Sequence, residues 1–273
     1  MQLKVTSYEI ENNVATIMLK RPGRRNSWTG RMHYEYRWCM EQSESDAGVR
    51  AIVVTGAGAD FCVGADSRAL EVHVKKGGYD PGTPKEMPRA GFGVKGEFDE
   101  DFVSQFGMTK PIVAAINGPV AGVGLAVACY ADLRFAAAGV KFTTAHGALN
   151  LPAEFGLSWV LPRLMGVTAA NDILLSSRVF LAEEAYELGL INQVLPQEEL
   201  LSRTYQYVRD MIARVSPGSL RATKRQIYAD LHGDAANSVR RSRGLIDRMT
   251  MEPNYREGVA AFKEKRSPHW SVE

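Results

Sequence analysis

Two glycine-rich turns are the parts of this sequence best placed to do chemistry, although neither relies on a reactive side chain. The segment GADFCVGADSRAL (residues 58–70) follows the apolar run AIVVTG, and NGPVAGVGL (residues 117–125) follows PIVAAI. Turns at the carboxyl ends of parallel strands expose backbone N–H groups, and a following helix adds the positive end of its dipole. Two such turns could bind one oxygen atom and stabilise negative charge on it. The alternative is that the glycines only let neighbouring elements pack closely.

Alternating strands and helices must position these turns. Strands are predicted from apolar, β-branched runs at residues 14–19, 51–56, 111–116 and 133–139, with a helix at residues 30–42 and another after the second turn. Such alternation predicts an α/β fold in which right-handed crossovers join parallel strands. From residue 181 the pattern is mostly helical, with helices predicted at residues 181–190 and 198–215, from about Ser219, and twice more before the C-terminus.

The composition limits the partners and the compartment. The 273 residues are 45% hydrophobic and 23% charged, which is ordinary for a globular protein with one substantial core. A net charge of +2 favours neither nucleic acid nor an anionic membrane as a partner. The three cysteines are unclustered, the histidines have no metal-ligand spacing, and no apolar run approaches the roughly 20 residues that span a bilayer. We therefore expect a soluble, cytoplasmic protein without a metal site.

Residues 71–102 interrupt every hydrophobic period with glycine, proline and mixed charge. We expect a long loop here. Such a loop in a compact domain is usually either a functional lid or a disordered insertion, and the sequence favours neither.

Several motifs in a fixed order resemble the crotonase superfamily, which contains the enoyl-CoA hydratases and isomerases. They are FCVGAD, INGPVAGVGLAVACYAD, LPRLMG and LAEEAYELGLINQVL, and the similarity extends from RPGRRNSW near the N-terminus to EGVAAFKEKRSP near the end. The resemblance implies a crotonase-like (ClpP/crotonase) spiral of ββα units. It implies an acyl-CoA-binding core at residues 1–200 and a C-terminal helical trimerisation region at residues 201–273. It also implies a homotrimer or hexamer, and no cofactor other than the coenzyme A of the substrate.

The same resemblance implies an oxyanion hole made of two backbone N–H groups. Carried over to this sequence, the donors are the N–H groups of Ala65 in FCVGAD and Val123 in NGPVAGVG. A thioester enolate carries its charge on oxygen, and losing one such donor typically lowers a rate by about a hundredfold to a thousandfold.

Both glutamates that flank the double bond in hydratases of this family are absent. The first position falls on Ala126 and the second on His146, in FTTAHGALNL. Hydration requires one group that activates water and another that delivers a proton to Cα, and alanine can do neither. The sequence therefore argues against ordinary hydration, the lyase reaction of the family.

One acid remains near these positions. Glu154 lies eight residues after His146, at a place where the dienoyl-CoA isomerases use an aspartate for proton transfer. A carboxylate beside a histidine and an apolar channel should have a perturbed pKa. The alternative is that Glu154 only stabilises the start of a helix. Three roles are open to His146: a general base oriented by Glu154, a passive hydrogen-bond partner of the substrate, or a satisfied interior residue.

The resemblance also implies which residues contact CoA and the acyl group. Basic side chains suit the phosphates of CoA. The substrate-binding candidates are Arg24, Arg25, Val63, Gly64, Ala65, Val123, Phe262 on the adenine side, and Lys265, with Lys263 and Arg266 as further phosphate partners. The basic end of the last helix has an alternative role as surface that complements the helix dipole.

Other prominent residues are assigned structural roles. Asp66 should cap the segment that follows it, and Asn117 should form a turn. Trp159, Leu161 and the surrounding VLPRLMG stripe are expected in the core or between subunits.

The sequence thus predicts an enoyl-CoA hydratase/isomerase-family enzyme of fatty-acid or related acyl-CoA metabolism. Isomerase-type proton transfer by Glu154 is favoured over hydration, because it needs only one base. A carbon–carbon hydrolase resembling the β-diketone hydrolases, with His146 and Glu154 as a dyad, is the first alternative, although the spacing there differs by one residue. A non-catalytic acyl-CoA binder is the second alternative.

Overall fold

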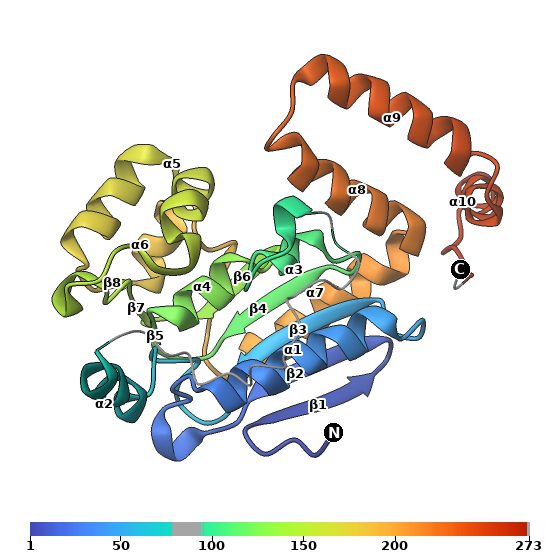
Figure 1. Cartoon of the computed structure of the whole chain (residues 1–273). Coiled ribbons are helices and arrows are strands. Elements are labelled where there is room, and N and C mark those ends of the chain that lie inside the picture. Colours follow the sequence, from blue (N-terminus) through green and yellow to red (C-terminus); the bar gives the residue numbers. More distant parts are fainter. Residues whose placement is uncertain (78–93, 95, 272–273) are drawn as a thin grey trace.

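A six-stranded sheet forms the centre of the computed structural model, which describes residues 1–77, 94 and 96–271. The strands lie in the order β1-β2-β3-β4-β6-β9 (Figure 1). Their bounds are β1 (Thr6–Glu11), β2 (Val14–Leu19), β3 (Ala51–Gly56), β4 (Ile112–Ile116), β6 (Leu133–Ala137) and β9 (Gln193–Leu195). β1 is antiparallel to β2, and every other neighbouring pair is parallel.

A second, three-stranded sheet lies across the carboxyl ends of the large one. It contains β5 (Val120–Ala121), β7 (Lys141–Thr143) and β8 (Phe180–Leu181), and a bridge between Cys62 and Val120 extends it toward β3. Strands of the large sheet are thus followed by a short strand or bridge and then a helix. This arrangement is the spiral of ββα units that the sequence predicts.

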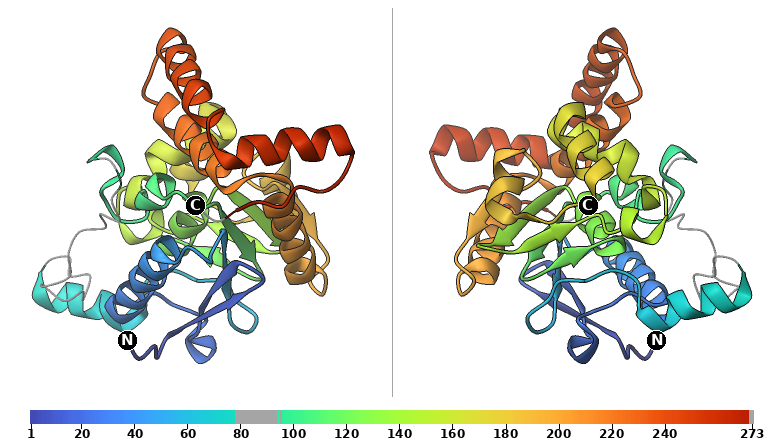
Figure 2. Two further views of the ribbon diagram at one scale, coloured as in Figure 1. Left: turned by 90° about the vertical axis from the view of Figure 1, so that its right-hand side faces the viewer. Right: turned by 90° about the vertical axis from the view of Figure 1, so that its left-hand side faces the viewer.

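Helices cover both faces of the large sheet. The helices of the described residues are α1 (Gly30–Ser45), α2 (Ser67–Lys76), α3 (Ser104–Gly107), α4 (Val123–Cys129), α5 (Leu157–Ser176), α6 (Ala182–Glu187), α7 (Leu200–Arg214), α8 (Pro217–Asp230), α9 (Ala235–Met249) and α10 (Pro253–Glu264). Short 3-10 turns are η1 (Pro22–Arg24), η2 (Gly96–Phe98), η3 (Gly147–Leu149) and η4 (Glu154–Gly156). Helices α1 and α7 lie on opposite sides of the sheet (Figure 2). Every residue of β3 and β4 is buried, as expected for parallel strands covered on both faces.

The C-terminal helices extend away from this core (Figures 1 and 2). Helix α8 packs against α3 and α9, and α9 has no buried residue. Among the described residues, no helix combines the length and the apolar character needed to cross a membrane.

The predicted strands are confirmed at residues 14–19 and 51–56. The strand predicted at residues 111–116 begins one residue later, and the strand predicted at residues 133–139 ends two residues earlier. The predicted helices correspond to α1, α4 and α6 to α10. Strand β1 was not predicted. Asn12 and Asn13, with φ of 50° and 62°, form the tight turn that pairs it with β2, and asparagine adopts positive φ more readily than most residues.

The prediction of a loop over residues 71–102 is wrong at its start and near its end. Helix α2 continues to Lys76, and residues 96–98 form η2. The Asp66 side chain accepts a hydrogen bond from the Arg68 N–H at 3.0 Å, so it caps α2 as the sequence predicts. No glycine or proline interrupts the helix before Gly77. Residues 78–93 and 95 lie outside the described residues.

Candidate active site

The two glycine-rich turns lie in direct backbone contact. The Cys62 carbonyl accepts a hydrogen bond from the Ala121 N–H at 3.0 Å, and the Cys62 N–H donates to the Pro119 carbonyl at 3.2 Å. Gly64 has a φ of 98°, and a Cβ there would lie 3.4 Å from the Ala121 oxygen. A Cβ on Gly122, whose φ is 50°, would lie 3.7 Å from the Gly64 Cα. The prediction that the two turns come together is therefore matched by the geometry of the residues that precede Ala65 and Val123.

Both candidate N–H donors are without an acceptor among the described residues. The Trp28 N–H donates to the Gly64 carbonyl at 2.7 Å, and the Asp66 N–H donates to the Trp28 carbonyl at 2.9 Å. This bridge fixes the backbone on both sides of Ala65 without using its N–H. Val123 is the first residue of α4, so its N–H has no acceptor within the helix. Each of the two groups is thus available to an acceptor outside the chain.

Helix α4 is held rigidly at both ends. At its start, a Cβ on Gly124 would lie 2.3 Å from the Cys62 carbonyl oxygen, so only glycine allows this approach. At its end, the buried Arg134 guanidinium donates to the carbonyls of Cys129 at 3.3 Å and Ala131 at 2.6 Å. A cation at the C-terminal end also complements the helix dipole. The packing thereby fixes the position and direction of the Val123 N–H.

Ala126 is fully buried within α4. Its methyl group cannot transfer a proton, so the geometry offers no replacement for the first hydratase glutamate at this position.

Glu154 lies beside the second turn. Its Oε2 atom is 3.7 Å from the position that a Cβ on Gly122 would occupy. Burial raises the pKa of the Glu154 carboxyl above the ordinary value of 4.5, and the charge of nearby His146 opposes this shift. No described group donates a hydrogen bond to this carboxylate. A half-buried, unpaired carboxylate with a raised pKa has the properties of a proton carrier.

Strained backbone surrounds the two titratable candidates. Ala145 precedes His146 with a φ of 60°, and Phe155 follows Glu154 with a φ of 49°. These values are uncommon for residues other than glycine and tend to occur at functional sites. The Tyr130 hydroxyl donates to the Phe155 carbonyl at 3.0 Å, which helps to hold this conformation.

His146 is buried, with 7% of its surface exposed, and its Nδ1 atom has no hydrogen-bond partner. The role of a satisfied interior residue therefore does not fit it. No hydrogen bond joins it to Glu154 in the described part of the chain, although the two are close enough for the histidine charge to affect the carboxyl pKa.

The candidate CoA-binding residues fall into two separate groups. Arg24 pairs with Asp66 at 3.1 Å, and Arg25 pairs with Asp60 at 2.8 Å, both near the first turn. Phe262 and Lys265 lie on and just after α10, and 85% of the Phe262 side chain is exposed. Helices α10 and α2 lie on opposite sides of the molecule (Figures 1 and 2). A single chain therefore brings Val63, Gly64, Arg24 and Arg25 to the turns but not the C-terminal candidates.

Sequence reasoning missed two groups of residues near the site. A network around Asp66, which includes Arg21 at 2.9 Å and Ser27 at 3.0 Å, lowers the pKa of the Asp66 carboxyl although burial opposes this. Aromatic residues near Glu154 form the second group. Trp159 and Leu161 were expected in the core or between subunits. Leu161 is fully buried, whereas Trp159 is partly exposed and lines a cavity.

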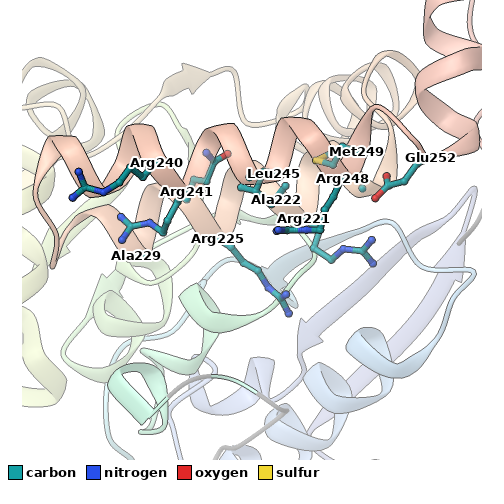
Figure 3. A pocket seen from close by; sticks show the side chains of 13 residues that line it. Arg221, Ala222, Arg225, Ala229, Arg240, Arg241, Leu245, Arg248, Met249 and Glu252 are labelled. Atoms are coloured by element: carbon teal, nitrogen blue, oxygen red, sulfur yellow. The ribbon is translucent and has the colours of Figure 1, made fainter.

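A different cavity of about 590 Å³ lies between α8 and α9. Five arginines line it, Arg221 and Arg225 from α8 and Arg240, Arg241 and Arg248 from α9 (Figure 3). It contains none of the predicted site residues. Within the described residues, no group of three or more His, Cys, Asp or Glu side chains could hold a metal ion.

Comparisons with known proteins agree with the fold. A model of the enoyl-CoA hydratase/isomerase family matches residues 9–273. The 1,2-epoxyphenylacetyl-CoA isomerase of Escherichia coli is 33% identical over 263 residues, which cover 96% of each chain. A probable enoyl-CoA hydratase of Mycobacterium tuberculosis is 32% identical over 262 residues, covering 93% of this chain and 88% of the relative. The crystal structure of a probable enoyl-CoA hydratase/isomerase from Mycobacterium abscessus has a TM-score of 0.86 and 27% identity, covering 98% of this chain and 99% of that chain.

The molecule therefore has the crotonase fold of acyl-CoA enzymes. More specifically, the chain belongs to the enoyl-CoA hydratase/isomerase family.

Proposed function

We propose that this enzyme moves a proton on the acyl group of a CoA thioester, as an isomerase rather than a hydratase. The N–H groups of Ala65 and Val123 bind the thioester oxygen and stabilise the enolate that forms when Cα loses a proton. Glu154 removes this proton and returns it to another carbon. The observation that carries the proposal is the unpaired, half-buried Glu154 carboxylate beside Gly122, together with alanine in place of the first hydratase glutamate.

The name of the Escherichia coli relative supports the same choice, since that protein is called a 1,2-epoxyphenylacetyl-CoA isomerase. An isomerase conserves the atoms of its substrate and so needs no activated water. One base that delivers the proton to a second carbon is sufficient.

Deuterium exchange at Cα tests the proposal. The enzyme in deuterated buffer should exchange Cα protons of saturated and unsaturated acyl-CoA thioesters, as followed by mass spectrometry. Tight binding without exchange at any chain length would overturn it and would favour a non-catalytic acyl-CoA binder.

A second candidate is hydrolysis of a carbon–carbon bond in a β-diketone or β-keto thioester. The unpaired Nδ1 of the buried His146 is the observation that favours it, because an imidazole with a free nitrogen can activate water. Product analysis separates the two candidates. Cleavage products that disappear in the Glu154→Gln and His146→Gln variants would indicate hydrolysis, and a rearranged thioester of unchanged mass would indicate isomerisation.

We also propose that the enzyme is a cytoplasmic homotrimer or hexamer in fatty-acid or related acyl-CoA metabolism, without a cofactor beyond the CoA of its substrate. The exposed Phe262 and Lys265 support this assembly, since a neighbouring chain could bring them to the CoA bound near Arg24 and Arg25.

A further inference from the structure

A cavity of about 410 Å³ lies directly beside the Glu154 segment. Its lining comes from η2, the η2–α3 connection, the C-terminal end of α4 and the start of α5, together with His232 after α8. Phe155 and Gly156, which follow Glu154, form part of the wall. Glu154 itself is not part of the lining, so Phe155 and Gly156 are the connection between the candidate base and this cavity. Its volume lies within the range of pockets that bind small ligands.

Four rings line one part of the cavity, those of Tyr130, Phe155, Trp159 and His232. The Trp159 and His232 rings stack with centroids 5.6 Å apart, and the Arg163 guanidinium lies 4.1 Å from the Trp159 ring centre. Each of these contacts restrains the Trp159 side chain. The wall is thus built from ring surfaces in fixed orientations.

The Phe155 ring is held in place by other aromatic rings. It packs edge to face on Phe102 at 5.2 Å, and Phe102 packs in the same way on Trp28 at 5.5 Å. Trp28 bridges to Ala65, so the aromatic packing is continuous with the first glycine-rich turn. Aromatic rings prefer such edge-to-face or offset contacts with other rings. A flat ring in the substrate would make contacts that an alkyl chain cannot make.

Three carboxylates, those of Glu97, Glu100 and Asp101, line another part of the same cavity. Asp101 accepts a hydrogen bond from the His33 Nε2 at 3.2 Å. Burial alone would raise the pKa of Asp101, but the hydrogen bond and charge of His33 lower it, so this carboxylate stays ionised. An ionised carboxylate accepts hydrogen bonds and donates none.

The carboxylates argue against a long apolar tail in this cavity. An alkyl chain packed against them would remove water from charged groups and offer no hydrogen bond in return, which is unfavourable. A donor on the substrate would replace the lost water and form a charge-assisted hydrogen bond.

We propose that the cavity selects a compact acyl group, made of a planar ring with a hydrogen-bond donor on the side away from the thioester. This inference rests on the proposed function, because it takes Glu154 to lie at the reacting end of the acyl group and the rest of that group to extend past Phe155 into the cavity. The donor can be a hydroxyl or an ammonium group, since both donate to carboxylates.

Binding of thioesters that undergo no net conversion tests the inference with the full-length enzyme. We expect phenylacetyl-CoA to bind about tenfold more tightly than octanoyl-CoA in isothermal titration calorimetry. A para-hydroxyl on the ring should tighten binding by about a further tenfold, as one hydrogen bond to a charged group would. A para-aminomethyl thioester provides the ammonium comparison, and the tighter of the two identifies the donor. Cyclohexylacetyl-CoA controls for planarity and should bind less tightly than phenylacetyl-CoA.

Variants locate the preference in this cavity. Glu100→Gln and Asp101→Asn should each reduce the advantage of the para-substituted ring, while phenylacetyl-CoA itself binds within about twofold of its original affinity. Trp159→Leu should remove the preference for a ring over octanoyl. Glu198→Gln, an exposed carboxylate outside the cavity, is the matched control and should change none of these ratios. Melting temperatures will show that each variant is folded.

The inference and the proposed function can fail separately. Binding ratios need no turnover, so an enzyme that exchanges no Cα proton but keeps the preference for a donor-bearing ring would contradict only the proposed function. Octanoyl-CoA binding as tightly as phenylacetyl-CoA would overturn the inference. A para-substituent advantage that is absent, or that survives in both acid variants, would overturn it as well.

Discussion

Helix α4 and helix α9 differ in what holds them in place. All seven residues of α4 are buried, whereas α9 spans 15 residues and buries none. Close backbone contacts fix the start of α4, and Arg134 binds the carbonyls at its end. Helix α9 has extensive contacts only with α8 within the described residues, and its Ile246 side chain is 59% exposed.

This difference suggests that the core and the C-terminal helices have different roles. The core positions backbone donors, whose direction depends on packing from every side. The C-terminal region carries apolar side chains that a single chain leaves in water, among them Met251 at 78% and Phe262 at 85% exposure. Another chain packed on this region would bury such side chains. The comparison therefore predicts that changes in the core remove chemistry, whereas changes on α9 alter assembly.

The largest effect is expected at Glu154. Glu154→Gln keeps the shape of the side chain but removes the base, so Cα exchange should fall by about a thousandfold. Deuterium incorporation followed by mass spectrometry measures this loss. Acyl-CoA affinity should stay within about threefold. If exchange persists at the original rate, another group is the base.

Gly124→Ala should break the positioning of α4. The added Cβ would lie 2.3 Å from the Cys62 carbonyl oxygen, so the helix must shift and the Val123 N–H with it. We expect about a hundredfold slower exchange and a loss of about 1–3 kcal/mol in the free energy of unfolding. Gly23→Ala is the matched control, because a Cβ there meets nothing within 4 Å. Equal effects of the two substitutions would contradict the role given to this contact.

Ile246→Glu tests whether α9 takes part in assembly. A charge on the exposed apolar face of α9 should weaken self-association by about thirtyfold, as loss of a central interface residue typically does. Sedimentation equilibrium measures the change. Val179→Glu, at an exposed apolar residue with a similar 56% exposure outside the C-terminal helices, is the control. An assembly unaffected by Ile246→Glu would show that α9 is not its interface.

The pH dependence of exchange should reflect the raised pKa of Glu154. Only the ionised carboxylate can remove a proton, so exchange should fall about tenfold for each pH unit below a pKa that exceeds 4.5. A raised pKa in the folded state also means that protonated Glu154 favours folding. This contribution is fully present below the unfolded pKa and is lost as pH rises through the folded pKa.

Urea denaturation of the wild type and of Glu154→Gln at several pH values measures this second effect. As the pH rises through the folded-state pKa of Glu154, the free energy of unfolding of the wild type should decrease relative to that of the variant. An exchange profile centred at or below 4.5 would contradict the raised pKa.

The smallest effect is expected for Arg25→Ala. The Arg25 side chain is 61% exposed, and its ion pair with Asp60 is accessible to water, so the free energy of unfolding should change by less than about 1 kcal/mol. If Arg25 contacts a CoA phosphate, acyl-CoA binding should weaken by about threefold to tenfold and become less sensitive to salt. Calorimetry at two salt concentrations distinguishes a phosphate contact from a purely structural pair.

Local pattern in the sequence was sufficient for much of the fold and for part of the site. The β-branched runs at residues 14–19 and 51–56 predicted β2 and β3, because buried parallel strands require such residues. The ordered glycine motifs indicated the family and the two turns. Alanine at position 126 and histidine at position 146 argued against hydration without any coordinates.

Tertiary structure alone decided which of these residues lie close together. Glu154 reaches Gly122 across more than 30 residues of sequence, and its raised pKa arises from burial by surrounding elements. The aromatic cavity likewise collects Tyr130, Trp159 and His232 from separate segments, so no local pattern could predict it. The sequence by itself determined the family, the main strands and the absence of both hydratase glutamates, because each depends on residue type and local order. Proximity, burial and strain depend on contacts between distant segments, so only the folded chain decided them.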